Sequence, residues 1–175
     1  MPSLTLETSR LWLQSLSLQD LQDILASRTL AGGPEIEPDA LEEPSLMVMA
    51  RKVERMQQAD SADHDWYTYW LIIRKESGTG IGFIGFKGLP DSQGYVEVGY
   101  GISANHRRQG LMSEALERMV EWASADPRCR GVTAIHVLKT NIGSQKVLVN
   151  CGFKVTGETP QSLHYLRELK STHDL

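Results

Sequence analysis

The segment HRRQG, residues 106–110, places two consecutive arginines and a glycine directly before a stretch of helical periodicity. The first turn of a helix presents unpaired backbone N–H groups and the positive end of the helix dipole, so it suits a phosphate. Arg107 and Arg108 would add charge for phosphate oxygens, and Gly110 would let the backbone come close. The segment therefore predicts a pyrophosphate-binding loop. Solvated loop arginines are the alternative.

The composition of the chain indicates that any anion is bound locally. The chain has 175 residues, a formal net charge of −4 and an isoelectric point near 5.7. No overall positive field would therefore attract nucleic acid or an anionic membrane. The amino terminus lacks a basic stretch followed by an apolar run, and no apolar segment is long enough to span a membrane. We expect a cytoplasmic chain that forms a single domain over residues 1–175.

Two other patterns do not indicate a site. Gly80, Gly82 and Gly85 match the dinucleotide-binding pattern GxGxxG, but that pattern needs a helix directly afterwards, whereas a turn and another strand follow here. Cys129 and Cys151 show neither a CxxC nor a paired spacing, and the chain has no HxxxH. We therefore expect reduced thiols and no bound metal.

The elements that must position the loop alternate between helix and strand. Periodicity and turn signals predict strands over residues 10–16, 67–75, 79–88, 95–102, 132–138, 153–158 and 163–169. They predict helices over residues 17–30, 45–58, 109–125 and 141–150. Short turns join the strands between residues 67 and 102, which favours an antiparallel meander. The order indicates a mixed α/β fold with one central sheet.

Four segments together resemble one protein family. Residues 107–112, RRQGLM, are similar to the acyl-CoA pyrophosphate loop Q/R-x-x-G-x-G/A of the GNAT superfamily of N-acyltransferases, with Met112 in place of the last small residue. LTLETSRLWLQSLSLQD resembles the opening LETERLxLRPLxxxD of the RimJ/RimL-like branch, the ribosomal-protein alanine acetyltransferases. VEVGYGI is similar to that branch's xEIGYWI strand, and NIGSQKVLVNCGF to its NxxSxxVxEKxGF helix and turn.

This resemblance implies a GNAT fold, with a mixed, mostly antiparallel, splayed sheet of about seven strands and about four flanking helices. It implies acetyl-CoA as co-substrate, no metal, and a pantetheine arm lying where the sheet opens after a bulge in the strand over residues 95–102. The residues that it assigns to CoA are Ile102, Arg107, Arg108, Gln109, Gly110, Leu111, Met112, Ser113, Asn141 and Ser144. Helix N-capping is an equally physical role for Asn141.

Glu97 is the candidate general base. Strand alternation places Val96, Val98, Tyr100 and Ile102 on one face, and Tyr95, Glu97, Gly99 and Gly101 on the other. If the second face lines the acceptor groove, Glu97 can take a proton from the attacking ammonium, because an amine must be neutral to attack a thioester. A surface carboxylate is the alternative. The resemblance implies a backbone oxyanion donor between Gly101 and Ser103.

Ser144 is the candidate partner of the departing thiolate. Many GNAT members carry a tyrosine eight positions into the helix that begins near Asn141, but this chain has Leu148 there. Ser144 is the residue that the RimJ/RimL-like branch suggests, and local backbone bonding near the helix start is its alternative role.

The sequence thus predicts an acyl-CoA-dependent N-acyltransferase that moves acetyl from acetyl-CoA to a primary amine, on a protein N-terminus or a small molecule, by direct attack in a ternary complex. A covalent acyl-enzyme is disfavoured, because neither cysteine lies in a basic, helix-terminal setting. The alternatives are a non-catalytic module that binds acyl-CoA, and a protein that binds N-termini and whose pocket has lost CoA. Glu97, Asp63 and Asp65 favour a cationic acceptor. Both a monomer and a homodimer fit the sequence.

Overall fold

The computed structural model describes residues 3–170, which build one sheet in the order β1-β2-β3-β4-β5-β6-β8-β7. The strands are β1 (Thr5–Glu7), β2 (Leu11–Ser15), β3 (Trp70–Arg74), β4 (Thr79–Phe86), β5 (Tyr95–Ile102), β6 (Gly131–Leu138), β7 (Lys154–Glu158) and β8 (Ser162–Glu168). Neighbouring strands are antiparallel except β5 and β6, which are parallel. The expected mixed, mostly antiparallel sheet is confirmed, with one strand more than expected, the short β1.

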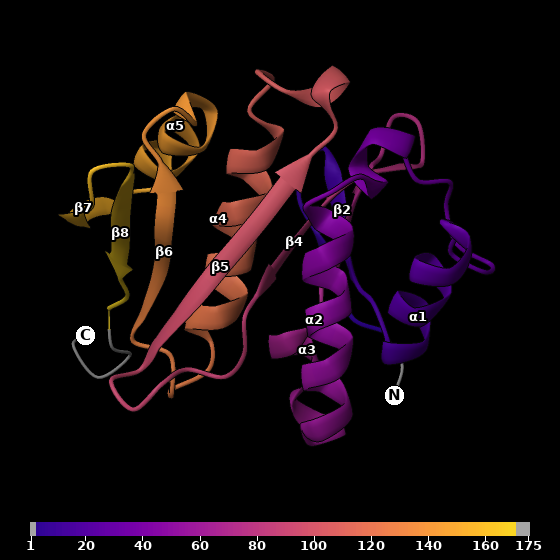
Figure 1. Ribbon diagram of the computed structural model, residues 1–175, viewed down its shortest axis with the longest axis horizontal. Helices are drawn as coiled ribbons and strands as arrows, with labels where there is room; N and C mark the ends of the chain where they lie inside the picture. Colours follow the sequence, from indigo (N-terminus) through magenta and orange to yellow (C-terminus); the bar gives the residue numbers. More distant parts are fainter. Residues whose placement is uncertain (1–2, 171–175) are drawn as a thin grey trace.

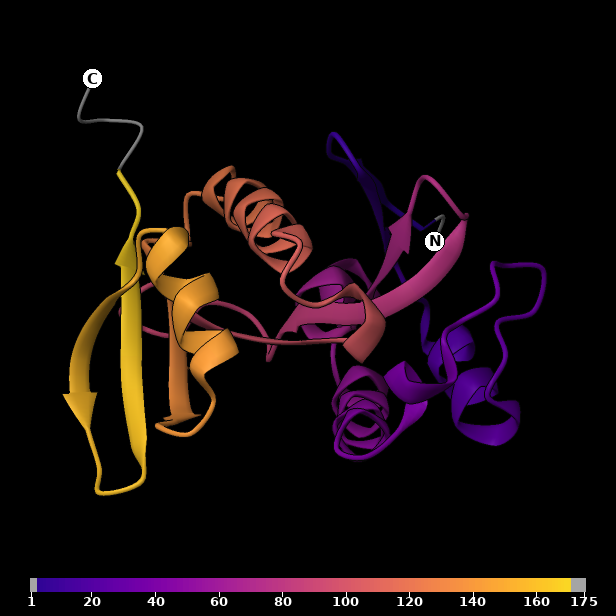
Figure 2. The same ribbon diagram turned by 90° about the horizontal axis from the view of Figure 1, so that it is seen from above.

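Helices cover both faces of the sheet (Figures 1 and 2). They are α1 (Leu18–Ser27), α2 (Ser45–Gln58), α3 (His64–Tyr67), α4 (Leu111–Ser124) and α5 (Ile142–Asn150), with short 3-10 turns η1 (Pro38–Leu41), η2 (Ser61–Asp63) and η3 (Ala104–His106). Figure 2 shows α4 and α2 on opposite sides of β5. Within the described residues, no helix combines the length and apolarity that a membrane crossing requires.

Two hydrophobic cores follow from the alternation of side chains along the central strands. In β3, Trp70 and Ile72 pack into the core beneath α4, whereas Leu71 and Ile73 pack into the core beneath α1 and α2. A strand that is apolar at every position is the expected pattern when both faces of a sheet are covered. The two cores fix β4 and β5 between the helix layers and so hold the site on a rigid support.

Several predicted boundaries differ from the structure by two or three residues, and two of these differences have a clear structural cause. The strand expected from residue 67 begins at Trp70, because Tyr67 ends α3 and the buried Trp66 turns inward against Trp122. The helix expected from Gln109 begins at Leu111, since Gly110 precedes it in a left-handed conformation at φ 76°. Aromatic residues fit both a strand and a buried helical turn, so their composition did not distinguish the two.

The sheet opens between β5 and β6. These strands pair only over Tyr95–Glu97 and Gly131–Thr133, and then separate, as Figure 1 shows. The splayed sheet is therefore confirmed. The bulge expected in β5 is not present in its pairing with β4, which keeps one register from Val98 to Ile102. An irregularity lies instead in β6, between Ala134 and Val137.

Candidate active site

The edge of β5 that faces the opening carries backbone groups of alternate residues. Lys87 N donates to Glu97 O at 3.0 Å and Ser103 N donates to Ile81 O at 2.7 Å, so the odd-numbered residues turn their backbone groups toward β4. Val98, Tyr100 and Ile102 consequently turn theirs toward the opening. An extended chain can be bound there by strand addition.

This alternation narrows the predicted oxyanion donor to one amide. Of the residues from Gly101 to Ser103, Ser103 already donates to β4, and Gly101 lies in the same alternate set. Ile102 is the remaining candidate for the oxyanion donor, and its backbone N–H points toward the opening.

The basic loop joins β5 to α4 at the wide end of the opening. Gly110 is the N-cap residue of α4, and no side chain accepts a hydrogen bond from the backbone amides of its first turn. Arg107 and Arg108 are exposed, Arg108 at φ 61°, and Arg107 Nε donates to Ile102 O at 3.3 Å. The free first-turn amides and exposed guanidinium groups form a site with the chemistry that a phosphate needs.

The helical residues assigned to CoA divide into buried and accessible positions. Leu111 and Met112 are buried in the core beneath α4, while Ser113 is half-buried. Because the side chain of Met112 points into that core, its size does not obstruct the outer surface of the loop. Gln109 is exposed, and its amide donates to Asn105 O at 3.2 Å.

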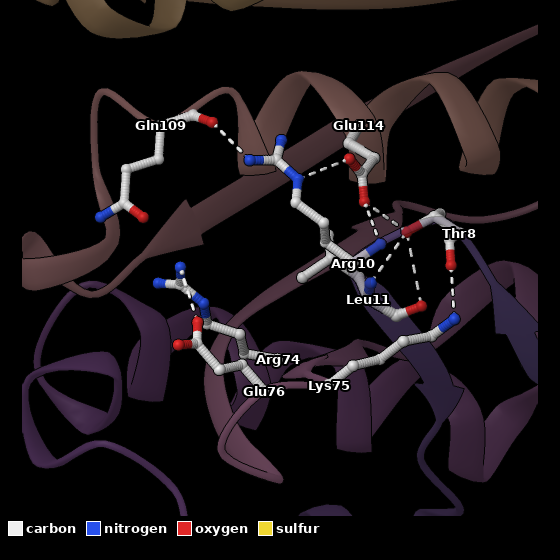
Figure 3. A network of polar contacts seen from close by, with 8 residues as sticks. All are labelled: Thr8, Arg10, Leu11, Arg74, Lys75, Glu76, Gln109 and Glu114. Carbon is white, nitrogen blue, oxygen red and sulfur yellow. Dashed lines mark hydrogen bonds and ion pairs between the residues drawn. The ribbon is translucent and has the colours of Figure 1, made fainter.

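A network from the amino-terminal segment anchors this loop (Figure 3). Arg10 Nη1 donates to Gln109 O at 2.9 Å, and Arg10 Nε pairs with Glu114 Oε1 at 2.9 Å. Thr8 Oγ1 donates to the other carboxylate oxygen at 2.5 Å. Although burial acts in the opposite direction, these bonds hold the pKa of Glu114 below its usual value. Sequence reasoning missed Arg10, since the contact joins residues far apart in the chain.

A second set of contacts anchors the loop from the other side. Arg74 Nη1 lies 2.9 Å from His106 Nδ1, and His106 Nε2 lies 3.2 Å from Glu37 Oε1. Because an arginine only donates, Nδ1 accepts and Nε2 carries the proton toward Glu37. Asp39 Oδ2 also accepts from Ala104 N at 2.9 Å. His106 is therefore a support of the loop.

Glu97 lies on the face of β5 toward α2, next to open space. A methyl group added at Gly99 would contact nothing within 4 Å, and one at Gly101 would meet only Ser45 Oγ at 4.0 Å. The side chain of Glu97 is 15% exposed and forms an ion pair with Lys87. The predicted position of Glu97 on the same face as Gly99 and Gly101 agrees with the structure. No pattern in the sequence indicated the ion pair with Lys87.

Ser144 lies across the opening from β5 and contacts Tyr100. Ser144 Oγ donates to Tyr100 Oη at 3.4 Å, and Tyr100 Oη donates to Ser144 O at 3.3 Å. Burial, the largest cause, raises the pKa of Tyr100 to about 12. Asn141 Oδ1 accepts from Ser144 N at 3.1 Å, so Asn141 does cap α5. Leu148 is fully buried and cannot reach a ligand.

The cysteines have no environment that would activate a nucleophile. Cys129 and Cys151 are both free and buried, and burial raises the pKa of each thiol to about 11. A thiolate is the reactive form, so this shift disfavours both thiols as nucleophiles at neutral pH. Within residues 3–170, no three His, Cys, Asp or Glu side chains gather as metal ligands would.

Comparison with known proteins identifies the family. A family model described as "Acetyltransferase (GNAT) domain" matches residues 10–154. The chain belongs to the GNAT acetyltransferase family. It is 32% identical over 97 residues to the uncharacterized N-acetyltransferase YjdG of Bacillus subtilis, covering 55% of this chain and 57% of YjdG. It is 28% identical over 154 residues to the uncharacterized N-acetyltransferase p20 of Bacillus licheniformis, covering 87% and 84%.

The same fold occurs among solved GNAT structures. RimL, a ribosomal L7/L12 α-N-protein acetyltransferase solved in complex with coenzyme A, superposes with a TM-score of 0.64 at 14% identity, covering 95% of this chain and 98% of RimL. The GNAT family and fold predicted from the sequence are therefore confirmed. The chain spans little more than half the length of YjdG.

Proposed function

We propose that this chain, acting as one acyltransferase domain, transfers acetyl from acetyl-CoA to a primary amine by direct attack in a ternary complex. One observation carries the proposal. The opening between β5 and β6 ends at the uncapped amino terminus of α4, where Arg107 and Arg108 are exposed. The open edge of β5, which would bind the pantetheine arm, thus leads to the anion site that would bind the pyrophosphate. Acetyl-CoA supplies the thioester as the acyl donor.

The residues of the chain divide the remaining tasks. The amides of Leu111 to Ser113 and the loop arginines hold the phosphates, and the even-numbered backbone groups of β5 align the arm. The amide of Ile102 stabilises negative charge on the thioester oxygen. Glu97 collects the ammonium and accepts a proton from it, directly or through water. The hydroxyl of Ser144, which contacts Tyr100 Oη, serves as the partner of the departing thiolate.

Charge reversal at Arg107 tests the anion site. Arg107→Glu suits this purpose better than a change at Gly110, whose φ of 76° strains any side chain. We expect acetyl-CoA, titrated by calorimetry, to bind Arg107→Glu about tenfold or more weakly than wild type, since a bond to a charged group contributes about 1.5–3 kcal/mol. Lys154→Glu reverses an exposed charge on β7 and should bind normally. Equal affinity of wild type, Arg107→Glu and Lys154→Glu for acetyl-CoA would contradict the proposed anion site.

Release of free thiol in the presence of amines distinguishes transfer from binding alone. Transfer predicts thiol release that depends on both acetyl-CoA and an amine. A non-catalytic acyl-CoA-binding module would bind acetyl-CoA with the same dependence on Arg107 but would release no thiol with any amine.

A further inference from the structure

The carboxylate of Glu97 has one occupied oxygen and one free oxygen. Lys87, the residue after β4, pairs with Oε2. Oε1 is buried and has no hydrogen-bond partner among the described residues. A buried carboxylate oxygen without a donor is costly, and native proteins rarely keep one without a purpose. Lys87 is 53% exposed, so its long side chain can move away from Glu97.

The charges around Glu97 are mostly positive. Lys52, on α2, is buried, and its Nζ donates to Phe86 O at 2.8 Å, one residue before Lys87. Arg55, one turn further along α2, donates to Lys87 O at 3.1 Å. Burial, with the charges of Arg55 and Lys87, lowers the pKa of Lys52 to about 7, while Glu97 acts in the opposite direction. One carboxylate therefore lies among three basic side chains.

These basic side chains argue against the cationic acceptor that was expected from the acidic residues of the sequence. Because Oε1 is buried, a simple amine that bound Glu97 as an ammonium would compete with Lys87 for Oε2 and would leave the lysine unpaired. A zwitterion avoids this cost, because its ammonium replaces Lys87 at Glu97 while its carboxylate pairs with Lys87. Gly99 and Gly101 leave open space for the rest of the molecule on the same face of β5.

Building on the proposed function, we propose that the acceptor is a free α-amino acid, whose carboxylate pairs with Lys87 while its amine is held at Glu97. In the reaction, the N–C bond forms and the C–S bond breaks. Of the two protons that leave the ammonium, one ends on the thiol of CoA and the other passes through Glu97 to solvent. Lys87 is a binding residue for the carboxylate of the substrate, and it frees Oε2 of Glu97 as it turns to that carboxylate.

The test uses a panel of L-amino acids, each paired with its carboxamide, and measures thiol release from acetyl-CoA. The carboxamide keeps the amine and the side chain but removes the negative charge. We expect kcat/KM for the best free acid to exceed that of its amide about tenfold or more. Lys87→Gln should remove this preference by lowering turnover of the acid, with little effect on the amide. Lys87→Arg should restore it.

Lys75→Gln is the matched control, because Lys75 also pairs with a glutamate, Glu7, at 2.5 Å, but at the far side of the sheet. It should keep the preference for acids. If amides or short peptides are acetylated as well as free acids, or if Lys87→Gln lowers both equally, the α-amino acid proposal is overturned while acetyl transfer stands. If acetyl-CoA binds but no amine of any kind releases thiol, the proposed function itself fails.

Discussion

Arg10 donates from Nη1 to the carbonyl oxygen of Gln109 at 2.9 Å, one residue before the glycine that opens α4. The same side chain is held by Glu114, one turn into that helix (Figure 3). The amino-terminal segment therefore sets the position of the phosphate loop relative to the first turn that is proposed to bind the phosphates.

Removing the hydrogen bond from Arg10 to Gln109 should weaken the binding of acetyl-CoA. In Arg10→Ala the loop loses one hydrogen bond, which contributes about 0.5–1.5 kcal/mol, so we expect the Kd to rise about two- to tenfold. Calorimetric titration measures it. Arg118→Ala, which removes an arginine paired with Glu121 on the same helix, should leave the Kd unchanged. An equal loss in both variants would show that the Arg10 contact has no special role.

Tyr100 and Ser144 should act as one unit. Each Tyr100→Phe and Ser144→Ala removes a hydroxyl of the same pair, so we expect similar falls in kcat of about two- to tenfold and little further loss in the double variant. Steady-state kinetics at saturating acetyl-CoA measure this coupling. Losses that simply multiply in the double variant would mean that the two hydroxyls contribute independently.

The absence of a tyrosine at residue 148 follows from packing. Leu148 is fully buried, so Leu148→Tyr should overpack the core and lower the free energy of unfolding by about 1–3 kcal/mol without raising kcat. The neighbouring Val149 is 61% exposed, and Val149→Tyr should change stability by less than about 0.5 kcal/mol. Urea unfolding of both variants checks this. A faster and equally stable Leu148→Tyr would contradict it.

Lys52 should make stability rise with pH near neutrality. Burial, the main cause, lowers the pKa of Lys52 to about 7 in the folded chain, whereas the ordinary pKa of a lysine is 10.5. Between these values the unfolded chain binds more protons than the folded chain, so the free energy of unfolding rises with pH, by up to about 1.4 kcal/mol per pH unit. Urea unfolding from about pH 6.5 to pH 8.5 should show this slope in wild type.

The Lys52→Met variant supplies the comparison. It lacks the titrating group, so its curve should rise less steeply than that of wild type over the same range. Lys75→Met, which removes a lysine outside the site, should keep the wild-type slope. Parallel curves for Lys52→Met and wild type would show that Lys52 does not titrate in this window.

Local patterns predicted most of the elements and the loop of the site. Helical periodicity located α4, and strand alternation placed Glu97 on the same face as Gly99 and Gly101. These features depend on residues that are near one another in the chain. The boundary at Tyr67 failed because burial of Trp66, a tertiary effect, decided between a strand and a helical turn.

Contacts between distant residues had no local signal. The pairing of Lys87 with Glu97, the packing of Lys52 behind it and the anchoring of Gln109 by Arg10 each depend on how helices and strands stack. Charge composition alone therefore suggested a cationic acceptor, whereas the folded arrangement places Lys52, Arg55 and Lys87 near Glu97.

The most direct test of acetyl transfer measures both products of one reaction. Purified protein is incubated with acetyl-CoA and a panel of amines that includes free amino acids, their carboxamides and short peptides, and free CoA and N-acetylated product are quantified by mass spectrometry. We predict equal amounts of the two, with both reduced together in Glu97→Gln. Free CoA without an acetylated amine would indicate thioester hydrolysis, and bound but unchanged acetyl-CoA would indicate a binding module. Either result would contradict the account.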